Sequence, residues 1–325
     1  MNIVILGGGG FLGRKIARHL AETGTLGGQA VSGLTLFDIA APPAPAAPFP
    51  VRSVAGDIAA LPEDAIPAGT DVIFHLAAVV SAAAEADYEL GRRVNLRGND
   101  AVIDACRKLA RPPRVVFTSS VASFSGGQDA VLEDDARQLP ANSYGAQKAA
   151  AELILQDATR RGFVDCVSIR LPTITVRPGR PNKAASSFVS SIIREPLLGE
   201  TAELPVGEAF AVWIASPRRA VDWLLHAAAM DSAKLGLDRG INPPGMSATV
   251  AQMLHALDTV KPGASALVRR VENETIAEIV GTWPAAFAPL RAPGLGFSAH
   301  ESLVDLVRAF VEDDLESTRS ERKND

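Results

Sequence analysis

The feature that most constrains this chain is a glycine-rich stretch near its N-terminus. The four apolar residues Ile3 to Leu6 have no polar interruption, which is typical of a strand buried on both faces. Glycines follow in the spacing Gly7-x-x-Gly10-x-x-Gly13, and apolar side chains then recur with helical period. A strand-to-helix turn without side chains lets the backbone approach a diphosphate at the helix N-terminus. We therefore predict a dinucleotide-binding site here rather than an ordinary tight turn.

A second apolar run, Leu34 to Phe37, ends in the acidic residue Asp38. An acidic side chain at the end of the second strand accepts hydrogen bonds from both hydroxyls of an adenosine ribose, and it repels a 2′-phosphate. No arginine follows Asp38 directly to bind such a phosphate. The sequence therefore favours NAD over NADP as the cofactor.

The composition of the chain indicates which partners it can bind and in which cellular compartment it works. The chain of 325 residues is long enough for one large α/β domain with a smaller companion, and its net charge of −5 supplies no positive field for nucleic acid or an anionic membrane. The two cysteines, Cys106 and Cys166, lie in apolar runs, so we expect buried free thiols and neither a disulfide framework nor a metal site. The N-terminal apolar run is short and no basic region precedes it, so we expect a cytoplasmic protein without a signal peptide or membrane span.

Strands and helices alternate along the first half of the chain. Apolar runs typical of buried strands recur, with helical patterns between them, at residues 51–57, 71–78, 114–120 and 165–172. This alternation predicts an α/β fold with a doubly wound parallel sheet, whose ligands bind beyond the carboxyl ends of the strands. Asp57, at one such end, either contacts the adenine or caps the next helix. His75, inside another run, is predicted to be a hydrogen-bonded core residue.

A tyrosine and a lysine four residues apart, Tyr144 and Lys148, occupy one face of a predicted alanine-rich helix. A free tyrosine is a poor base at neutral pH because its pKa is about 10, but a neighbouring cation favours the phenolate. We therefore predict that Lys148, together with an oxidised nicotinamide, lowers the pKa of Tyr144 so that it accepts a proton from the substrate. Ser120 or Ser119 would hold the substrate oxygen, and Lys148 would also reach the nicotinamide ribose.

Six features of the chain belong to one pattern: the glycine spacing, the acidic residues Asp38 and Asp57, the run His75-Leu76-Ala77-Ala78, Asn95, the serine pair and the Tyr-x-x-x-Lys motif. With these features the chain resembles the extended short-chain dehydrogenase/reductase family. This family includes sugar-nucleotide epimerases and dehydratases, and the resemblance runs to about Pro172. It implies a Rossmann fold with a smaller C-terminal substrate lobe, NAD as cofactor, and a homodimer. It also implies that Tyr144 is the catalytic acid or base, that Lys148 activates it, and that Ser120, with Ser119 as the alternative, binds the substrate hydroxyl. The implied cofactor contacts are Gly7, Gly10, Phe11, Leu12, Gly13, Asp38, Asp57, Leu76, Ala77, Ala78, Asn95, Tyr144, Lys148 and Pro172.

Two departures narrow the choice within the family. Sugar-nucleotide dehydratases carry an Asp-Glu pair directly after the catalytic hydroxyl, where this chain has Val121 and Ala122. Epimerases follow the sixth strand with an Asn-x-Tyr-Gly-Pro pattern, which residues 173–183 lack. The sequence therefore disfavours dehydration and predicts a dehydrogenase. A sugar-nucleotide epimerase and a non-catalytic NAD sensor are the alternatives.

The same segment gathers cationic and polar side chains just past the end of a strand, at Arg177, Arg180, Asn182 and Lys183. Guanidinium groups suit a carboxylate through parallel hydrogen bonds, so Arg177 and Arg180 are predicted to bind a small anionic substrate; the alternative is a solvated loop. Residues 171–205 and 296–302 also resemble a subgroup that oxidises the C2 hydroxyl of D-erythronate, a four-carbon sugar acid. We therefore predict NAD-dependent oxidation of such an acid to the 2-oxo acid.

The later part of the chain divides between two lobes. We expect residues 1–177 to form the NAD-binding domain, with residues 210–245 returning to it. Residues 178–209 and 246–325 are predicted to form the substrate-binding lobe. The charged end of the chain, from residue 312 onwards, is expected to be a solvated and fraying tail.

Overall fold

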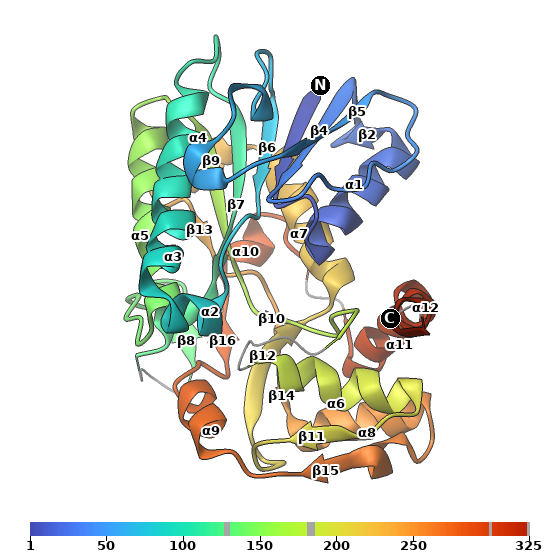
Figure 1. Cartoon of the computed structure of the whole chain (residues 1–325). Helices are drawn as coiled ribbons and strands as arrows, with labels where there is room; N and C mark the ends of the chain where they lie inside the picture. Colours follow the sequence, from blue (N-terminus) through green and yellow to red (C-terminus); the bar gives the residue numbers. More distant parts are fainter. Residues whose placement is uncertain (127–130, 181–185, 299–300, 324–325) are drawn as a thin grey trace.

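A fully parallel sheet of seven strands forms the larger lobe (Figure 1). The computed structural model describes residues 1–126, 131–180, 186–298 and 301–323. In spatial order the strands of this sheet are β13 (Gly240–Ile241), β9 (Asp165–Leu171), β7 (Arg114–Ser120), β6 (Val72–His75), β1 (Asn2–Leu6), β4 (Gly33–Asp38) and β5 (Val51–Ala55). The chain starts in the middle at β1 and winds outwards in both directions, so the carboxyl ends of the strands share one edge.

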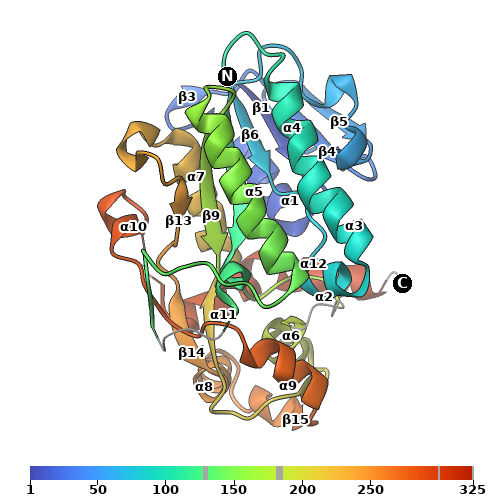
Figure 2. The same cartoon turned by 90° about the vertical axis from the view of Figure 1, so that its left-hand side faces the viewer.

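Helices cover both faces of this sheet. Alternate residues of β1 enter different cores: Ile3 and Ile5 pack with α1 (Phe11–Thr23) and α7 (Pro217–Ala229), whereas Val4 and Leu6 pack with the opposite layer. Figure 2 shows that layer, with α3 (Tyr88–Arg92), α4 (Gly98–Cys106) and α5 (Ser143–Arg160) lying across the sheet. The predicted doubly wound α/β fold is therefore confirmed.

The smaller lobe has its own sheets and its own apolar core. Its three-stranded sheet has the order β10 (Thr173–Ile174), β12 (Ala211–Ala215) and β14 (Met246–Thr249), and a parallel pair joins β11 (Ala202–Leu204) to β15 (Val268–Arg270). The helices that pack on this core are α6 (Ser187–Leu198), α8 (Val250–Val260) and α11 (Leu303–Asp313). We expected residues 210–245 to return to the first lobe, but β12 pairs with β10 and β14. Within that segment, α7 and β13 are the elements that join the large sheet.

The remaining helices and strands are short. They are α2 (Ser81–Ala86), α9 (Glu274–Gly281), α10 (Arg291–Gly294), α12 (Leu315–Lys323), β2 (Thr25–Leu26), β3 (Gln29–Ala30), β8 (Leu132–Glu133) and β16 (Phe287–Ala288). The presence of α12 corrects our expectation of a fraying tail, since Thr318 within it has no exposed surface.

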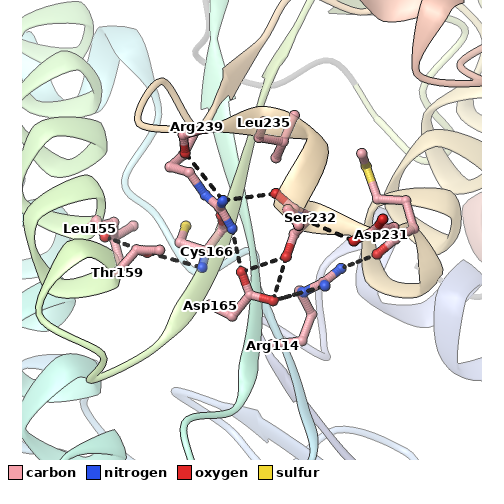
Figure 3. A network of polar contacts seen from close by, with 12 residues as sticks. Arg114, Leu155, Thr159, Asp165, Cys166, Asp231, Ser232, Leu235 and Arg239 are labelled. Atoms are coloured by element: carbon pink, nitrogen blue, oxygen red, sulfur yellow. Dashed lines mark hydrogen bonds and ion pairs between the residues drawn. The ribbon is translucent and has the colours of Figure 1, made fainter.

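A polar network closes the end of the large sheet that lies opposite the glycine turn (Figure 3). Asp165, the first residue of β9, forms ion pairs with Arg114 of β7 and with Arg239, and it accepts a hydrogen bond of 2.7 Å from the Ser232 hydroxyl. Arg114 also donates to the carbonyl oxygens of Ala227 and Met230, at 2.7 and 3.1 Å, where α7 ends. The network therefore joins α7 to two central strands and satisfies terminal helix carbonyls.

Replacing Asp165 with Asn should lower the free energy of unfolding by about 2 kcal/mol, because two arginines lose their counter-charge. This value is below the usual cost of breaking a buried pair, since the Asp165 side chain is 35% exposed. Asp104→Asn is the matched control, because Asp104 pairs with Arg107 on the surface and its loss should cost less than about 0.5 kcal/mol. Equal effects of the two substitutions in denaturant unfolding would contradict the structural importance of the network.

Candidate active site

The glycine turn between β1 and α1 is held open by backbone geometry. Gly7 has φ of 91°, in the left-handed region, and its N–H donates to the carbonyl of Phe37 at 2.8 Å. A Cβ atom on Gly7 would lie 2.7 Å from the Ala77 nitrogen, and one on Gly13 would overlap the Gly7 carbonyl. At Gly10 a Cβ would meet only the Gly7 oxygen, at 3.3 Å. The turn and the start of α1 therefore form a side-chain-free cradle that fits a cofactor diphosphate.

The acidic residue at the end of β4 stands beside this cradle. One carboxylate oxygen of Asp38 accepts a hydrogen bond from the Gly9 N–H at 2.9 Å, and the other accepts from Ile39 N–H at 2.8 Å. Asp38 lines a hollow together with the turn and with residues 76–78. Residues 39–43, at the start of a proline-rich segment without a binding motif, also line this hollow. The carboxylate is thus fixed where an adenosine ribose would lie.

Asp57 takes the second of the two roles proposed from the sequence. Its carboxylate accepts a hydrogen bond from Ala59 N–H at 2.9 Å, which caps the short helix that follows β5, and it forms an ion pair with Arg93. Asp57 does not line the hollow beside Asp38. Contact with adenine remains a prediction.

A cavity of about 290 Å³ runs from the glycine turn to the smaller lobe. The larger lobe contributes the carboxyl ends of β1, β6, β7 and β9 and the first turns of α1 and α5. The predicted site residues that line it are Gly7, Gly10, Phe11, Leu12, Gly13, Leu76, Ala78, Ser119, Ser120, Tyr144, Lys148, Pro172 and Arg177. The fold therefore brings together residues separated by up to 170 positions in the chain.

The two adjacent serines at the end of β7 have different partners. The Ser120 hydroxyl hydrogen-bonds the Tyr144 phenol and also accepts from Ala122 N–H at 3.1 Å. The Ser119 hydroxyl donates instead to the carboxylate of Glu152, which is itself paired with Arg170 at 2.8 Å. Because successive side chains of a strand point to opposite sides, only one of the two can face Tyr144. The geometry therefore singles out Ser120.

Lys148 is buried under the cavity floor, with 2% of its surface exposed. Its ammonium group donates to the Thr118 carbonyl at 2.7 Å and lies 4.5 Å from the centre of the Phe117 ring. Burial lowers the pKa of Lys148 to about 7, although the negative charge of Glu152 acts in the opposite direction. His75, stacked near Phe117, is likewise buried, and burial together with the charge of Lys148 lowers its pKa to about 3. His75 is therefore a neutral core residue.

Tyr144 differs from our expectation in the direction of its pKa shift. Burial raises the pKa of Tyr144, and the opposing influences are the charge of Arg177 and the hydrogen bond from Ser120. The ammonium group of Lys148, which we expected to lower the pKa, is turned towards the Thr118 carbonyl and lies 5.7 Å from the Tyr144 ring centre. Burial thus keeps Tyr144 protonated at neutral pH, and the cation whose charge opposes this effect is Arg177.

The two arginines predicted to bind substrate lie in different environments. Arg177 lines the cavity, and its Nε donates to the Ile174 carbonyl at 3.0 Å. Within the described ranges no carboxylate forms an ion pair with Arg177. Arg180 is exposed and is not among the described residues that line the cavity. Asn182 and Lys183, also named from the sequence, lie outside the described residues.

Asn95 acts on the backbone beside the cavity and does not line it. Its side chain accepts from Val79 N–H at 2.9 Å, donates to Val79 O at 3.0 Å, and donates to Gln147 of α5 at 2.7 Å. The buried amide thereby joins the segment after β6 to the helix that carries Tyr144 and Lys148. Its predicted direct contact with NAD is not supported by this geometry.

The smaller lobe also contributes cavity residues that were not predicted as site residues. They include Thr173 and Ile174 of β10, Ser186, just before α6, and Trp283, after α9. The indole Nε1 of Trp283 is buried and has no hydrogen-bond partner among the described residues, and such a donor usually finds one. No motif surrounds Ser186 or Trp283, so only the folded arrangement reveals them.

A parallel Rossmann-type sheet, a glycine cradle with an acidic residue beside it, and a buried tyrosine and lysine on one helix face define a class of NAD-binding oxidoreductases. Residues 3–223 match the model of the NAD-dependent epimerase/dehydratase family, and the chain belongs to that family. It is an NAD-dependent dehydrogenase acting on CH–OH groups. The predicted family resemblance and the NAD cofactor are therefore confirmed.

Individual relatives match almost the whole chain. A D-erythronate dehydrogenase from Cupriavidus necator is 48% identical, with 96% of this chain and 98% of the relative covered. A D-erythronate dehydrogenase from Haemophilus influenzae is 39% identical, with coverages of 97% and 100%. A crystal structure described as a nucleoside-diphosphate-sugar epimerase from Agrobacterium tumefaciens is 45% identical and superposes with a TM-score of 0.92, covering 97% of this chain and 95% of that one.

In the part of the chain that the structure describes, no group of three or more His, Cys, Asp and Glu side chains is arranged to bind a metal ion. None of the described helices combines the length and the apolar character needed to cross a membrane.

Replacing Lys148 with Met should raise the melting temperature of the protein, because the buried site disfavours the ammonium group. The pKa of Lys148 falls from 10.5 to about 7 on folding. At and below about pH 7 the lysine is therefore protonated in both the folded and the unfolded protein, and the folded state bears the full free-energy cost of burying the charge. That cost decreases as the pH rises towards 10.5, because the folded protein then releases the proton. The gain in melting temperature should therefore be larger at about pH 6 than at about pH 9. Lys108→Met, at an exposed position, should show no such dependence. A lower melting temperature for Lys148→Met at both pH values would contradict this account.

Proposed function

We propose that this enzyme oxidises the C2 hydroxyl of a small sugar acid to the 2-oxo acid, with D-erythronate as the substrate. The observation that supports it best is the pairing of Arg177 and Tyr144 in one cavity. A guanidinium group that pairs with no carboxylate among the described residues suits a carboxylate of the substrate, and the hydroxyl next to that carboxylate then lies near the phenol. The two relatives named D-erythronate dehydrogenase support the choice of acid.

The charges of the cavity favour this substrate over a sugar nucleotide. Among the described lining residues, Lys148 and Arg177 are the cations, and the Lys148 ammonium is already bonded to the Thr118 carbonyl. One available guanidinium matches one carboxylate, whereas a nucleoside diphosphate carries further negative charge on its diphosphate. Epimerisation of a sugar nucleotide is the alternative function, because the similar Agrobacterium structure is described as an epimerase.

The catalytic residues then have distinct tasks. The glycine cradle and Asp38 would hold NAD, which would supply the acceptor for the C2 hydride. Tyr144 accepts the proton of the C2 hydroxyl through its phenolate, and Ser120, already hydrogen-bonded to it, orients that hydroxyl. Arg177 holds the carboxylate and favours the phenolate by its charge, and Lys148 maintains the shape of the floor and reaches the ribose. The products are the 2-oxo acid, reduced cofactor and one proton.

A panel of four- to six-carbon sugar acids, offered with NAD and with NADP, tests the reaction directly. We expect net formation of reduced cofactor, followed by its absorbance, to be fastest with D-erythronate and NAD. Tyr144→Phe should reduce kcat at least about 100-fold, because the proton acceptor is lost, while NAD binding measured by calorimetry stays unchanged. Interconversion of a sugar nucleotide without net reduced cofactor would favour the epimerase, and unchanged turnover by Tyr144→Phe would remove this residue from the mechanism.

Substitution of the two arginines tests how the acid is bound. Arg177→Ala should raise KM for the acid about 30-fold, equivalent to about 2 kcal/mol for a lost charge-assisted hydrogen bond. Arg180→Ala is the matched control from the same segment, and it should change KM less than about twofold because this residue lies outside the described cavity wall. A larger effect of Arg180→Ala than of Arg177→Ala would overturn the assignment of the carboxylate.

A further inference from the structure

The last helix of the chain contacts the segment that carries Arg177 into the cavity. In α12, Arg322 donates from Nη2 to the Gly179 carbonyl at 2.9 Å. The Gly179 N–H donates to the hydroxyl of Thr318, one turn earlier in α12, at 3.4 Å. Both polar groups of the Gly179 backbone are thus bound by one helix. Figure 1 shows α12 at the side of the molecule, next to the smaller lobe and near α1.

A second arginine holds the same segment from the other side. Arg194 of α6, with 1% of its surface exposed, donates from Nη1 to the Arg177 carbonyl at 2.7 Å. Its Nη2 donates to Glu195 Oε1 at 2.8 Å, and Arg322 Nη2 lies 3.3 Å from the same oxygen atom. One carboxylate oxygen therefore links the two arginines that hold the carbonyls of residues 177 and 179.

The carboxylates beside this segment pair with arginines other than Arg177. Glu195 pairs with Arg194 and Arg322, and Glu200 forms a second ion pair with Arg322. Among the described residues, neither carboxylate forms an ion pair with the Arg177 guanidinium. That group stays at the cavity wall, and Tyr144 is the neighbour whose negative form would favour its charge.

The start of α12 is attached to the cofactor lobe. Asp314, the residue before α12, accepts a hydrogen bond of 2.8 Å from Lys15 of α1, and the preceding Asp313 pairs with Arg218 of α7. One end of this short helix therefore rests on the helix that opens at the glycine cradle. The other end binds the backbone of Gly179 through Thr318 and Arg322, and Arg194 of α6 binds the Arg177 carbonyl in the same segment.

We propose that Arg322 is a positioning residue for the anion site: it acts through the backbone of residues 177–179 and keeps the Arg177 guanidinium at the cavity wall. The role of that site in binding a substrate carboxylate rests on the function proposed above, whereas the positioning of the segment does not. A residue about 145 positions from Arg177 in the chain thereby sets the affinity for the anionic substrate.

Hydrogen exchange tests the positioning without reference to activity. In Arg322→Ala, the amide of Gly179 should exchange at least about 10-fold faster than in the unsubstituted protein, because Arg322 no longer holds the Gly179 carbonyl against the helix whose Thr318 accepts from that amide. Arg319→Ala is the matched control on the same helix, since Arg319 pairs with Glu316 on the surface. Unchanged exchange in Arg322→Ala, or equal acceleration in the control, would overturn the proposal whatever the substrate is.

Kinetics then test whether Arg322 acts through Arg177. We expect Arg322→Ala to raise KM for the acid about 10-fold while NAD affinity stays unchanged, and Arg322→Lys to restore part of the affinity for the acid. In an Arg177→Ala background, Arg322→Ala should raise KM no further. Additive effects, or an equal fall in kcat, NAD affinity and melting temperature, would show a purely structural role and overturn the proposal. Absence of turnover of every sugar acid by the unsubstituted protein would refute the proposed function alone.

Discussion

The contact between the start of α1 and the end of β1 is so close that no side chain fits, and the cofactor site depends on it. A Cβ on Gly13 would lie 2.9 Å from the Gly8 Cα and would overlap the Gly7 carbonyl. The first turn of α1 is therefore drawn against the carboxyl edge of the sheet, with its free N–H groups directed at the cavity. Asp38 reinforces this arrangement, since it accepts a hydrogen bond from Gly9 within the turn itself.

Burial of charge is the second constraint on the site. Burial lowers the pKa of Lys148 and of Arg177 and raises that of Tyr144, so it makes the charged form of each group less favourable than it is in water. Opposite charges counteract this effect at short range, because Arg177 and a phenolate at Tyr144 stabilise each other. In the proposed reaction a bound carboxylate and the phenolate share the charge of Arg177. Deprotonation of Tyr144 and binding of the acid are therefore linked through one guanidinium group.

Sequence reasoning recovered the parts of the site that local pattern determines. The glycine spacing, the acid after β4 and the Tyr-x-x-x-Lys pair each combine a residue type with a spacing that one element enforces. It could not distinguish Ser119 from Ser120, because the difference lies in which face of β7 meets Glu152 and which meets Tyr144. Asn95 was correctly associated with the active-site backbone, yet its partners, Val79 and Gln147, follow from packing.

Tertiary structure decided the remaining features. The apolar run of β12 suits either sheet by its composition, and its pairing with β14 depends on where the chain crosses between the lobes. The charged end of the chain has the composition of a solvated tail, but Thr318 and Arg322 become ordered because they meet the backbone of Gly179. Likewise the pKa of Tyr144 depends on Arg177, which is 33 residues away and reaches it only in the folded cavity.

The two walls of the cavity carry separate parts of the chemistry. Ser120, Tyr144 and Lys148 belong to the sheet and helices of the larger lobe, whereas Ser186 and Trp283 come from the smaller one. Dehydrogenases and epimerases both transfer a hydride and a proton, so the same residues of the larger lobe can serve both reactions. Relatives that catalyse different reactions can therefore differ only in the residues of the smaller lobe that bind the substrate. The buried indole N–H of Trp283, which has no partner among the described residues, offers a polar ligand group a hydrogen bond there. In the proposed function, selection of substrate therefore depends on the smaller lobe and on the segment at Arg177 that joins it to the sheet.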